Sequence, residues 1–119
     1  MDLIAFVPAT DLDRARTFYE GTLGLTFEST SPFACVFRAG DTMLRVTKVD
    51  TFTPQPFTVL GWSVDDIEAD VRKLTSAGVS FQRFNGMDQD DLGVWTTPDG
   101  SKVAWFKDPD GNTLSLTQF

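Results

Sequence analysis

The sequence contains no histidine, and it has a single cysteine and a single tyrosine among its 119 residues. Histidine is the side chain that most often ligates transition metals and exchanges protons near neutral pH. Cys35 cannot form an internal disulfide, and a chain without a disulfide framework is typical of the reducing cytoplasm. We therefore expect a cytoplasmic protein in which any metal or acid–base chemistry would need other side chains.

Basic residues are also scarce, because 10 Lys and Arg against 17 Asp and Glu give a formal net charge of −7. Nucleic acids and anionic membranes are polyanions, so this charge disfavours both as partners. No stretch approaches the roughly 20 apolar residues that a membrane-spanning helix needs. The first residues lack a basic region and soon reach Pro8, which disfavours a signal peptide. We expect no nucleic acid and no membrane partner.

Large apolar side chains are plentiful: hydrophobic residues make up 41% of the chain, with 11 Phe and 3 Trp. A chain of this length suits one compact domain with a genuine core. So many aromatic rings can fill the core and also line a cavity. This composition predicts a globular protein with aromatic surface to spare for a ligand.

Two segments, residues 4–27 and 60–81, repeat the same order: a short apolar strand, an acidic helix start, a helix, a glycine and another strand. The other expected strands complete two βαβββ modules, with strands after the helices at 24–29, 33–38, 43–48, 79–84, 102–107 and 112–118. Module 1 covers about residues 1–50, a linker about 51–57, and module 2 about 58–119. Neither module can bury both faces of its sheet alone, so we expect one domain.

Each helix carries its own start signal and an apolar stripe. Thr10 or Asp11 can cap the first helix, and Asp65 or Asp66 the second. Gly78 suits the position just after the second helix. The expected buried stripes are Leu12, Ala15, Phe18 and Tyr19 in the first helix, and Ile67, Val71 and Leu74 in the second.

Three segments carry a resemblance to a known family: "DLDRARTFYEGTLGL" (11–25), "GWSVDDIEADVRKLTSAGV" (61–79) and "FKDPDGNTLSL" (106–116). The chain resembles the vicinal oxygen chelate superfamily, which includes glyoxalase I, extradiol dioxygenases, fosfomycin-modifying enzymes and bleomycin-resistance proteins. The resemblance implies an α+β fold in which the two modules form a curved mixed-sheet cup within a single domain, residues 1–119. It also implies a homodimer.

Metal-dependent members of this superfamily supply histidine or glutamate ligands from four strands. Counting along the motifs places four side chains in these positions: Ile4, Arg45, Val59 and Ser115. For the second position the strand neighbours Met43 and Thr47 are alternatives. Two aliphatic side chains, a cation and a hydroxyl cannot coordinate a divalent metal, so we expect no metal and no other cofactor.

Strand alternation predicts which side chains face the cup, since residues two apart share a face. A turn at 39–42 pairs Val36 with Arg45, and a four-residue loop at 108–111 pairs Phe106 with Thr113. The expected ligand-binding residues are Phe6, Val36, Met43, Arg45, Trp95, Phe106, Thr113 and Ser115. Such a lining suits a flat, partly apolar small molecule. Arg45 can bind a carboxylate or phosphate; alternatively, it reaches solvent or an acidic neighbour.

No catalytic residue is expected, because no Asp or Glu falls on a cup-facing position and Tyr19 belongs to the helix stripe. Cys35 is interpreted as a small structural hydrophobe. We favour a metal-independent protein, similar to bleomycin-resistance proteins, that sequesters a drug or metabolite. A divergent glyoxalase-like lyase or isomerase is the alternative, and a purely structural or regulatory subunit would be favoured if the cup were collapsed and filled by Phe6 and Trp95. The charge of the ligand stays open.

Overall fold

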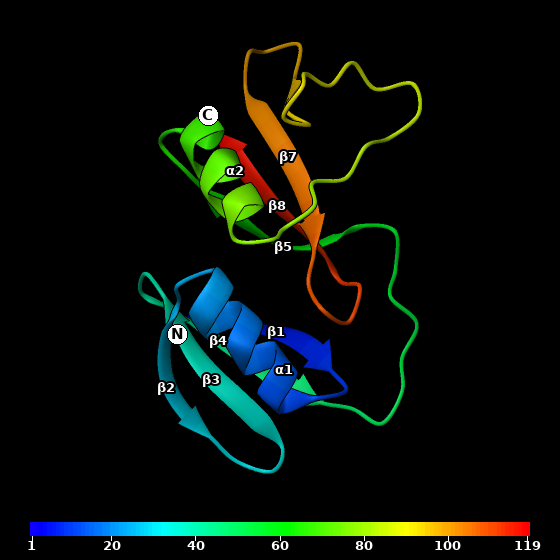
Figure 1. Cartoon of the computed structure of the whole chain (residues 1–119). Coiled ribbons are helices and arrows are strands. Elements are labelled where there is room, and N and C mark those ends of the chain that lie inside the picture. Colours follow the sequence, from blue (N-terminus) through cyan, green and yellow to red (C-terminus); the bar gives the residue numbers. More distant parts are fainter. The chain divides into compact units, whose positions relative to one another are not determined.

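The computed structural model describes residues 1–119, and the chain divides into two units (Figure 1). The first unit comprises Met1–Gln55 and Asp108–Asn112, and the second comprises Pro56–Lys107 and Thr113–Phe119. Each unit contains one four-stranded mixed sheet and a helical segment. This arrangement confirms the predicted α+β class. That both modules form a single domain stays a prediction.

The first sheet has the strand order β1-β4-β3-β2. Its strands are β1 (Ile4–Ala9), β2 (Thr26–Thr30), β3 (Ala34–Ala39) and β4 (Thr42–Lys48). β1 runs parallel to β4, whereas β3 runs antiparallel to both β4 and β2. Both outer strands are interrupted: β1 contains Pro8, and β2 shifts register between Phe27 and Ser29.

A short helix packs on one face of the first sheet, against β3 and β4 (Figure 1). It consists of α1 (Leu12–Arg16) and a π-helical turn, η1 (Thr17–Thr22). The carboxylate of Asp11 accepts the backbone N–H groups of Asp13 and Arg14, at 3.0 and 3.1 Å, which satisfies two free donors of the first turn. Ala15 and Tyr19 are the buried members of the predicted stripe.

The second sheet has the strand order β5-β8-β7-β6. Its strands are β5 (Thr58–Ser63), β6 (Trp95–Thr96), β7 (Lys102–Lys107) and β8 (Thr113–Gln118). β5 runs parallel to β8, and β7 runs antiparallel to β8 and β6. The outer strands are again interrupted, because β5 shifts register between Thr58 and Leu60 and β6 has only two residues.

The strand predicted at 79–84 does not form, and β6 is the fourth strand instead. Part of the backbone of this segment bonds to one side chain, and the N–H of Gln82 donates to the carbonyl of Trp105 in β7 at 2.8 Å. The amide of Gln89 donates to the carbonyl oxygens of Gln82 and Gly93, at 2.9 and 2.8 Å, and accepts the N–H of Phe84 at 2.8 Å. Backbone groups that find side-chain partners do not need a neighbouring strand.

The second helix, α2 (Ile67–Ser76), matches its prediction at both ends. Asp66 caps it by accepting the N–H of Ala69 at 3.1 Å, and Ile67, Val71 and Leu74 are buried. The helix stops at Gly78, whose φ of +96° is a left-handed conformation that favours glycine. The N–H groups of Gly78 and Val79 donate to the carbonyls of Thr75 and Leu74, both at 3.0 Å.

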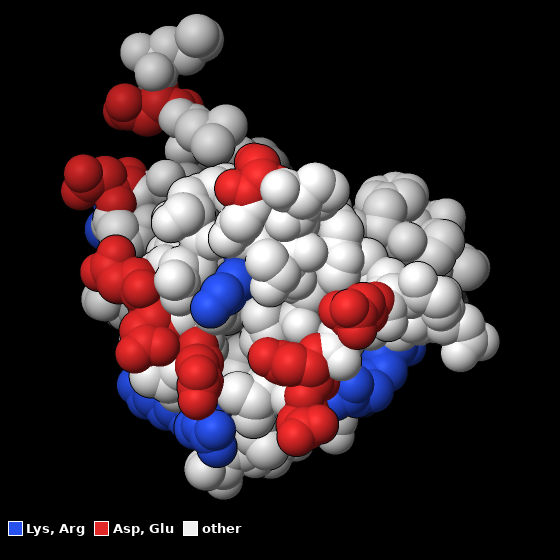
Figure 2. Space-filling view, turned by 90° about the horizontal axis from the view of Figure 1, so that it is seen from above, with Lys and Arg blue, Asp and Glu red and all other residues white.

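Charged side chains lie on the exposed surface. Figure 2 shows acidic groups along one border of a face and also across its middle, with basic groups near some of them and uncharged surface between. Arg16–Glu20 and Arg72–Glu68 are exposed pairs four residues apart on helical segments, and such pairs contribute little to stability. No helix is both long enough and apolar enough to cross a membrane.

Candidate functional site

Each sheet has one face that its own helix does not cover, which we call the helix-free face. On the first sheet the register places Phe6 of β1 and Val36 of β3 on either side of Arg45. Ile4 and Met43 form the next row of the same face, since they pair directly and lie two residues away. The predicted pairing of β3 with β4 is therefore confirmed.

These side chains differ in how much of them a ligand could touch. Phe6 is 59% exposed and Ile4 44%, whereas Val36 is only 7% exposed. Met43 and Arg45 are half-buried. The structure thus brings together four of the predicted residues on the first sheet (Phe6, Val36, Met43 and Arg45), of which Val36 offers little accessible surface.

The register of the second sheet differs from the prediction by one residue. The turn between β7 and β8 contains five residues, 108–112, rather than four, and it pairs Lys107 with Thr113 and Trp105 with Ser115. The N–H of Asp108 donates to the carbonyl of Asn112, and the N–H of Gly111 donates to the carbonyl of Asp108, both at 3.0 Å. Because side chains alternate, this one-residue shift moves every side chain of β7 to the other face.

Phe106 consequently does not lie on the helix-free face, where the prediction placed it. Phe106 pairs with Leu114, is fully buried, and packs its ring 5.4 Å from that of Phe81 on the helix side of the sheet. Trp105 takes the place on the helix-free face beside Ser115. Asn112 is the sequence signal that could have placed Trp105 on this face. Asparagine favours turns over strands, and counting it with the turn gives five turn residues and the observed register.

Three aromatic rings lie in a row in the second unit. The rings of Trp95 and Trp105 are 6.2 Å apart, centroid to centroid, and tilted by 30°. Phe84 meets Trp105 edge-on at 5.4 Å. Trp95 pairs with Val103 rather than with the predicted Ala104. Both tryptophans are half-buried and Phe84 is 42% exposed, so this aromatic row presents ring surface to solvent.

Thr113 and Ser115 lie on the helix-free face of β8 and are only 8% and 7% exposed. Ser115 faces Gly61 of β5 across the parallel pair. A Cβ atom at position 61 would lie 2.7 Å from the Ser115 Oγ, closer than real Cβ contacts allow. Gly61 therefore provides the space that the hydroxyl occupies.

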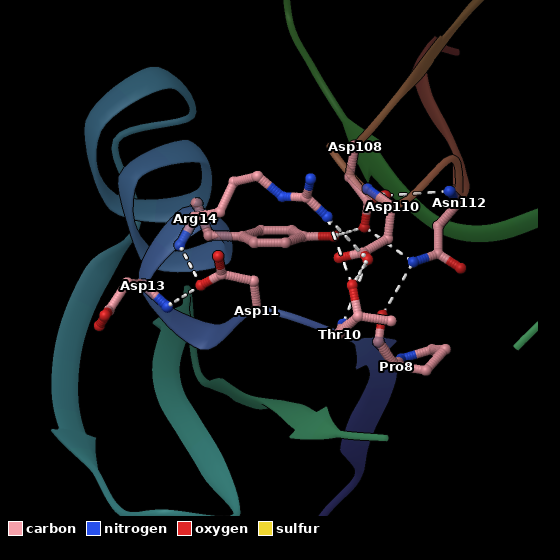
Figure 3. Close-up of polar contacts among 9 residues, drawn as sticks. Pro8, Thr10, Asp11, Asp13, Arg14, Asp108, Asp110 and Asn112 are labelled. Carbon is pink, nitrogen blue, oxygen red and sulfur yellow. Dashed lines mark hydrogen bonds and ion pairs between the residues drawn. The ribbon is translucent and has the colours of Figure 1, made fainter. Parts of the chain in front are cut away.

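A buried polar cluster fixes the 108–112 turn (Figure 3). One carboxylate oxygen of Asp108 accepts the N–H groups of Asp110 and Asn112, at 3.0 and 2.9 Å. The other accepts the Tyr19 hydroxyl at 2.7 Å and the Asn112 side-chain amide at 2.8 Å. The same amide donates to the carbonyl of Pro8 at 3.0 Å. The turn is thereby held against β1 and η1 of the first unit.

Asp110 forms the second part of this cluster (Figure 3). Its Oδ1 accepts the backbone N–H and the hydroxyl of Thr10, at 3.1 and 2.6 Å, and the Arg14 guanidinium at 3.1 Å. Its Oδ2 is buried and has no hydrogen-bond partner within the chain. The two carboxylates of the turn hold backbone and side chains in place, and neither reaches a helix-free face.

Burial raises the pKa of Tyr19 far above its ordinary value of 10.0, and the neighbouring carboxylate of Asp108 raises it further. Both causes disfavour the phenolate, because it would be a desolvated anion beside another anion. Tyr19 thus acts as a hydrogen-bond donor and stays protonated. This residue was predicted to pack in the helix stripe, which is confirmed, but its bond to Asp108 was not foreseen.

The four residues predicted to occupy the metal positions of the superfamily have side chains that do not fit a metal ion. Ile4 and Val59 are partly exposed hydrocarbons, Arg45 is permanently positive, and Ser115 offers one neutral hydroxyl. Divalent cations in such sites are bound by imidazole nitrogens or carboxylate oxygens. No group of three or more His, Cys, Asp or Glu side chains in the chain is arranged to hold a metal.

A shallow groove of about 320 Å³ lies elsewhere on the second unit. Its volume is at the lower end of small-molecule sites, and its charged side chain Arg83 already donates to the carbonyl of Asp90 at 2.6 Å. None of the predicted site residues belongs to it. The groove is lined by Thr75, Val79, Ser80, Phe81, Arg83, Asp91 and Leu92.

The sequence matches the model of the Glyoxalase/Bleomycin resistance protein/Dioxygenase superfamily over residues 2–116. Among solved structures, the antibiotic binding protein TnmS3 from Streptomyces sp. CB03234 is 26% identical with a TM-score of 0.71, and the match covers 99% of this chain and 94% of that one. A bleomycin resistance determinant encoded on the transposon Tn5 is 24% identical with a TM-score of 0.76, covering 99% and 97%. Lactoylglutathione lyase from Agrobacterium tumefaciens is 18% identical with a TM-score of 0.77, covering 99% and 92%. No curated protein matches the chain.

Replacing Tyr19 with phenylalanine should lower the free energy of unfolding by about 1.5–3 kcal/mol, because a buried hydrogen bond to a carboxylate is lost while the ring is kept. The raised pKa also predicts a pH dependence. The folded state holds the proton more tightly, so this stabilisation is present below pH 10.0 and is lost as the pH rises above that value. Urea unfolding of both proteins across alkaline pH measures these effects, and Y19F should lack the alkaline loss.

Tyr19 is the only tyrosine, so phenolate absorbance reports on it alone. Phenolate should appear together with loss of the circular dichroism signal of the fold. Phenolate that forms near pH 10.0 in a still-folded protein would contradict the buried cluster.

Gly61→Ala should destabilise the protein by about 1–3 kcal/mol, because the added methyl group crowds the Ser115 hydroxyl. Ser115→Ala removes the hydroxyl, so Gly61→Ala should cost much less in that background. Thermal unfolding of the two single variants and the double variant measures the coupling between the sites. Equal costs of Gly61→Ala in both backgrounds would show that the close approach does not matter.

Proposed function

The chain belongs to the Glyoxalase/Bleomycin resistance protein/Dioxygenase superfamily, and we propose that it is a metal-independent cytoplasmic protein that sequesters a small molecule, a drug or a metabolite. The aromatic row of Trp95, Trp105 and Phe84 carries this proposal. Large rings on a sheet face are normally buried in the core. Here they are partly exposed, with no helix of their own sheet covering them.

The aromatic row suits a planar ligand. Trp95 and Trp105 are tilted by only 30° from parallel, so both rings offer faces of similar orientation for stacking. Aromatic contacts of this kind contribute about 0.5–1.5 kcal/mol each beyond the burial of area. The ring positions are fixed by backbone pairing of β6 with β7, which reduces the ordering cost of binding.

Metal independence is supported by the donor chemistry of the four superfamily positions. The side chains of Ile4, Val59 and Arg45 supply no atom that can ligate a metal ion, and Ser115 alone cannot replace a set of imidazoles and carboxylates. The sequence also places no Asp or Glu beside Arg45 or Ser115 on the strands of the helix-free faces. A general base for catalysis would therefore have to come from a loop.

The names of two similar structures support a binding role, since one is an antibiotic binding protein and the other a bleomycin resistance determinant. The same fold is also found in a lactoylglutathione lyase. A glyoxalase-like lyase or isomerase is accordingly the second candidate, and the experiment below separates the two.

We also propose that the protein is a homodimer. Apolar side chains are exposed where β1 begins, with Leu3 76% and Ile4 44% exposed. Contiguous exposed apolar surface of this kind commonly marks a protein–protein interface. A second copy of the chain is the partner that the superfamily resemblance implies.

A thermal-shift screen of antibiotics and planar aromatic metabolites, with and without EDTA, tests the binding proposal. A ligand at about a hundred times its Kd stabilises the fold by about 2.7 kcal/mol, which raises Tm by several degrees for a domain of this size. Binding should persist in EDTA, and Trp105→Leu should weaken it about tenfold or more. Trp62→Leu, on the opposite face of the same sheet, is the matched control and should leave the affinity unchanged.

Turnover is measured in parallel with methylglyoxal and a thiol in the presence of Zn²⁺, Ni²⁺, Fe²⁺ or Mn²⁺. The proposal expects no stoichiometric metal and no turnover. Stoichiometric metal together with turnover would replace the binding role with the lyase role.

Sedimentation equilibrium over a range of concentrations tests the dimer. The native chain should sediment with twice the mass of one copy, 13.2 kDa, and Leu3→Lys should shift it toward monomer by placing a charge in the apolar run. Phe119→Lys changes an equally apolar and exposed side chain at the other end of the chain and should have no effect. A native monomer at all concentrations would dismiss the dimer.

A further inference from the structure

Arg45 is the one arginine of the chain that has no partner. Four others form ion pairs: Arg14–Asp110, Arg16–Glu20, Arg38–Glu28 and Arg72–Glu68. Arg83 donates to the carbonyl of Asp90 at 2.6 Å. The side chain of Arg45 makes neither an ion pair nor a hydrogen bond, although Arg45 lies within β4 rather than at a chain end or in a loop.

The surroundings of Arg45 on its face are apolar. Phe6 and Val36 flank it across the sheet, and Met43 precedes it on the same face of β4. The nearby Arg38, in contrast, forms an ion pair with Glu28 at 2.6 Å. Arg45 is half-buried beside these apolar side chains, and no acceptor of the chain pairs with its guanidinium, which leaves its hydrogen-bond donors free for a ligand.

We propose that Arg45 and Phe6 together recognise a small molecule that carries a carboxylate or a phosphate next to a planar apolar group. A guanidinium presents a planar fork of donors that matches either anion with two parallel hydrogen bonds. The Phe6 ring, 59% exposed in the neighbouring strand position, offers contact for the apolar part. The inference rests on the proposed small-molecule binding and specifies the charge of the ligand.

The net charge of the protein allows anion binding at Arg45 to be distinguished from general electrostatic attraction. With a net charge of −7 the protein repels anions at long range. An anion that nevertheless binds must be held by local contacts. A cationic ligand, in contrast, would meet the unpaired positive charge of Arg45 at this face.

Benzoate, benzamide and benzamidine form a suitable set of probes, because they share shape but are anionic, neutral and cationic. The readout is the shift of the backbone amide NMR signals of Phe6, Val36 and Arg45 during titration. Benzoate should bind about tenfold more tightly than benzamide, and benzamidine should leave these signals unchanged. Phenyl phosphate, titrated in parallel, shows whether phosphate or carboxylate is preferred, and tighter binding than benzamide by either anion supports the site.

Arg45→Gln removes the charge with little change in length and should reduce benzoate binding to the level of benzamide. Arg45→Lys keeps the charge but not the fork, and should retain part of the preference. Arg38→Gln, on the same face but paired with Glu28, is the matched control and should bind benzoate like the native chain. Unchanged circular dichroism of each variant verifies the fold.

The inference is overturned if benzoate and phenyl phosphate cause no shifts at these signals, or if Arg45→Gln keeps the preference for the anion. These results concern the first sheet and do not depend on the Trp105 variant or the thermal-shift screen. A protein that fails here but binds planar ligands through Trp105 would keep its proposed function and lose only the anion specificity.

Discussion

The carboxylate of Asp108 is the centre on which the second half of the chain depends. It accepts four hydrogen bonds, from the Tyr19 hydroxyl, the Asn112 side chain and two backbone N–H groups. Buried acceptors must be satisfied, and in the five-residue turn the N–H groups of Asp110 and Asn112 both reach this carboxylate. The length of the turn in turn decides which side chains of β7 accompany Ser115. A small buried cluster thus helps to place Trp105, and not Phe106, on the helix-free face beside Ser115.

The two helix-free faces use different chemistry. The face of the first sheet combines Phe6 and Met43 with an unpaired guanidinium, and the second unit presents the aromatic row beside small hydroxyl and glycine positions. Both faces include positions that the superfamily resemblance implies for metal ligands, namely Ile4 and Arg45 on the first sheet and Ser115 on the second. The scaffold is shared, and the side chains at these positions favour contact and orientation over coordination.

Much of this arrangement could be predicted from the sequence where a short local signal decides the structure. The hairpin of β3 and β4 was predicted in its correct register because Gly40, with a φ of +58°, closes a tight turn next to Asp41. The buried face of α2 followed from the spacing of its apolar residues. The register of β7 was predicted wrongly because the turn before β8 is held by a hydrogen bond from Tyr19 to Asp108, two residues that are remote in sequence.

The strand prediction for the region before β6 was wrong for a related reason. Residues 79–84 have the alternation of a strand, but they bond to β7 through the N–H of Gln82, and the side chain of Gln89 bonds the carbonyl of Gln82 and the N–H of Phe84. Propensity cannot indicate such a contact, because it depends on where the following loop places the side-chain amide of Gln89. The predicted ligand-binding residues on β1, β3 and β4 share one face as expected, and their role in binding stays a prediction.

The interruptions of the outer strands have a consequence for association. Pro8 removes a donor from β1, β2 and β5 shift register, and β6 is only two residues long. Unpaired strand edges invite another chain to extend the sheet, and proline, bulges and brevity are the usual protections against it. All four edges of the two sheets carry one of these protections. Self-association of this chain should therefore proceed through side-chain surfaces rather than through a continuous intermolecular sheet, which also guards the protein against fibril formation.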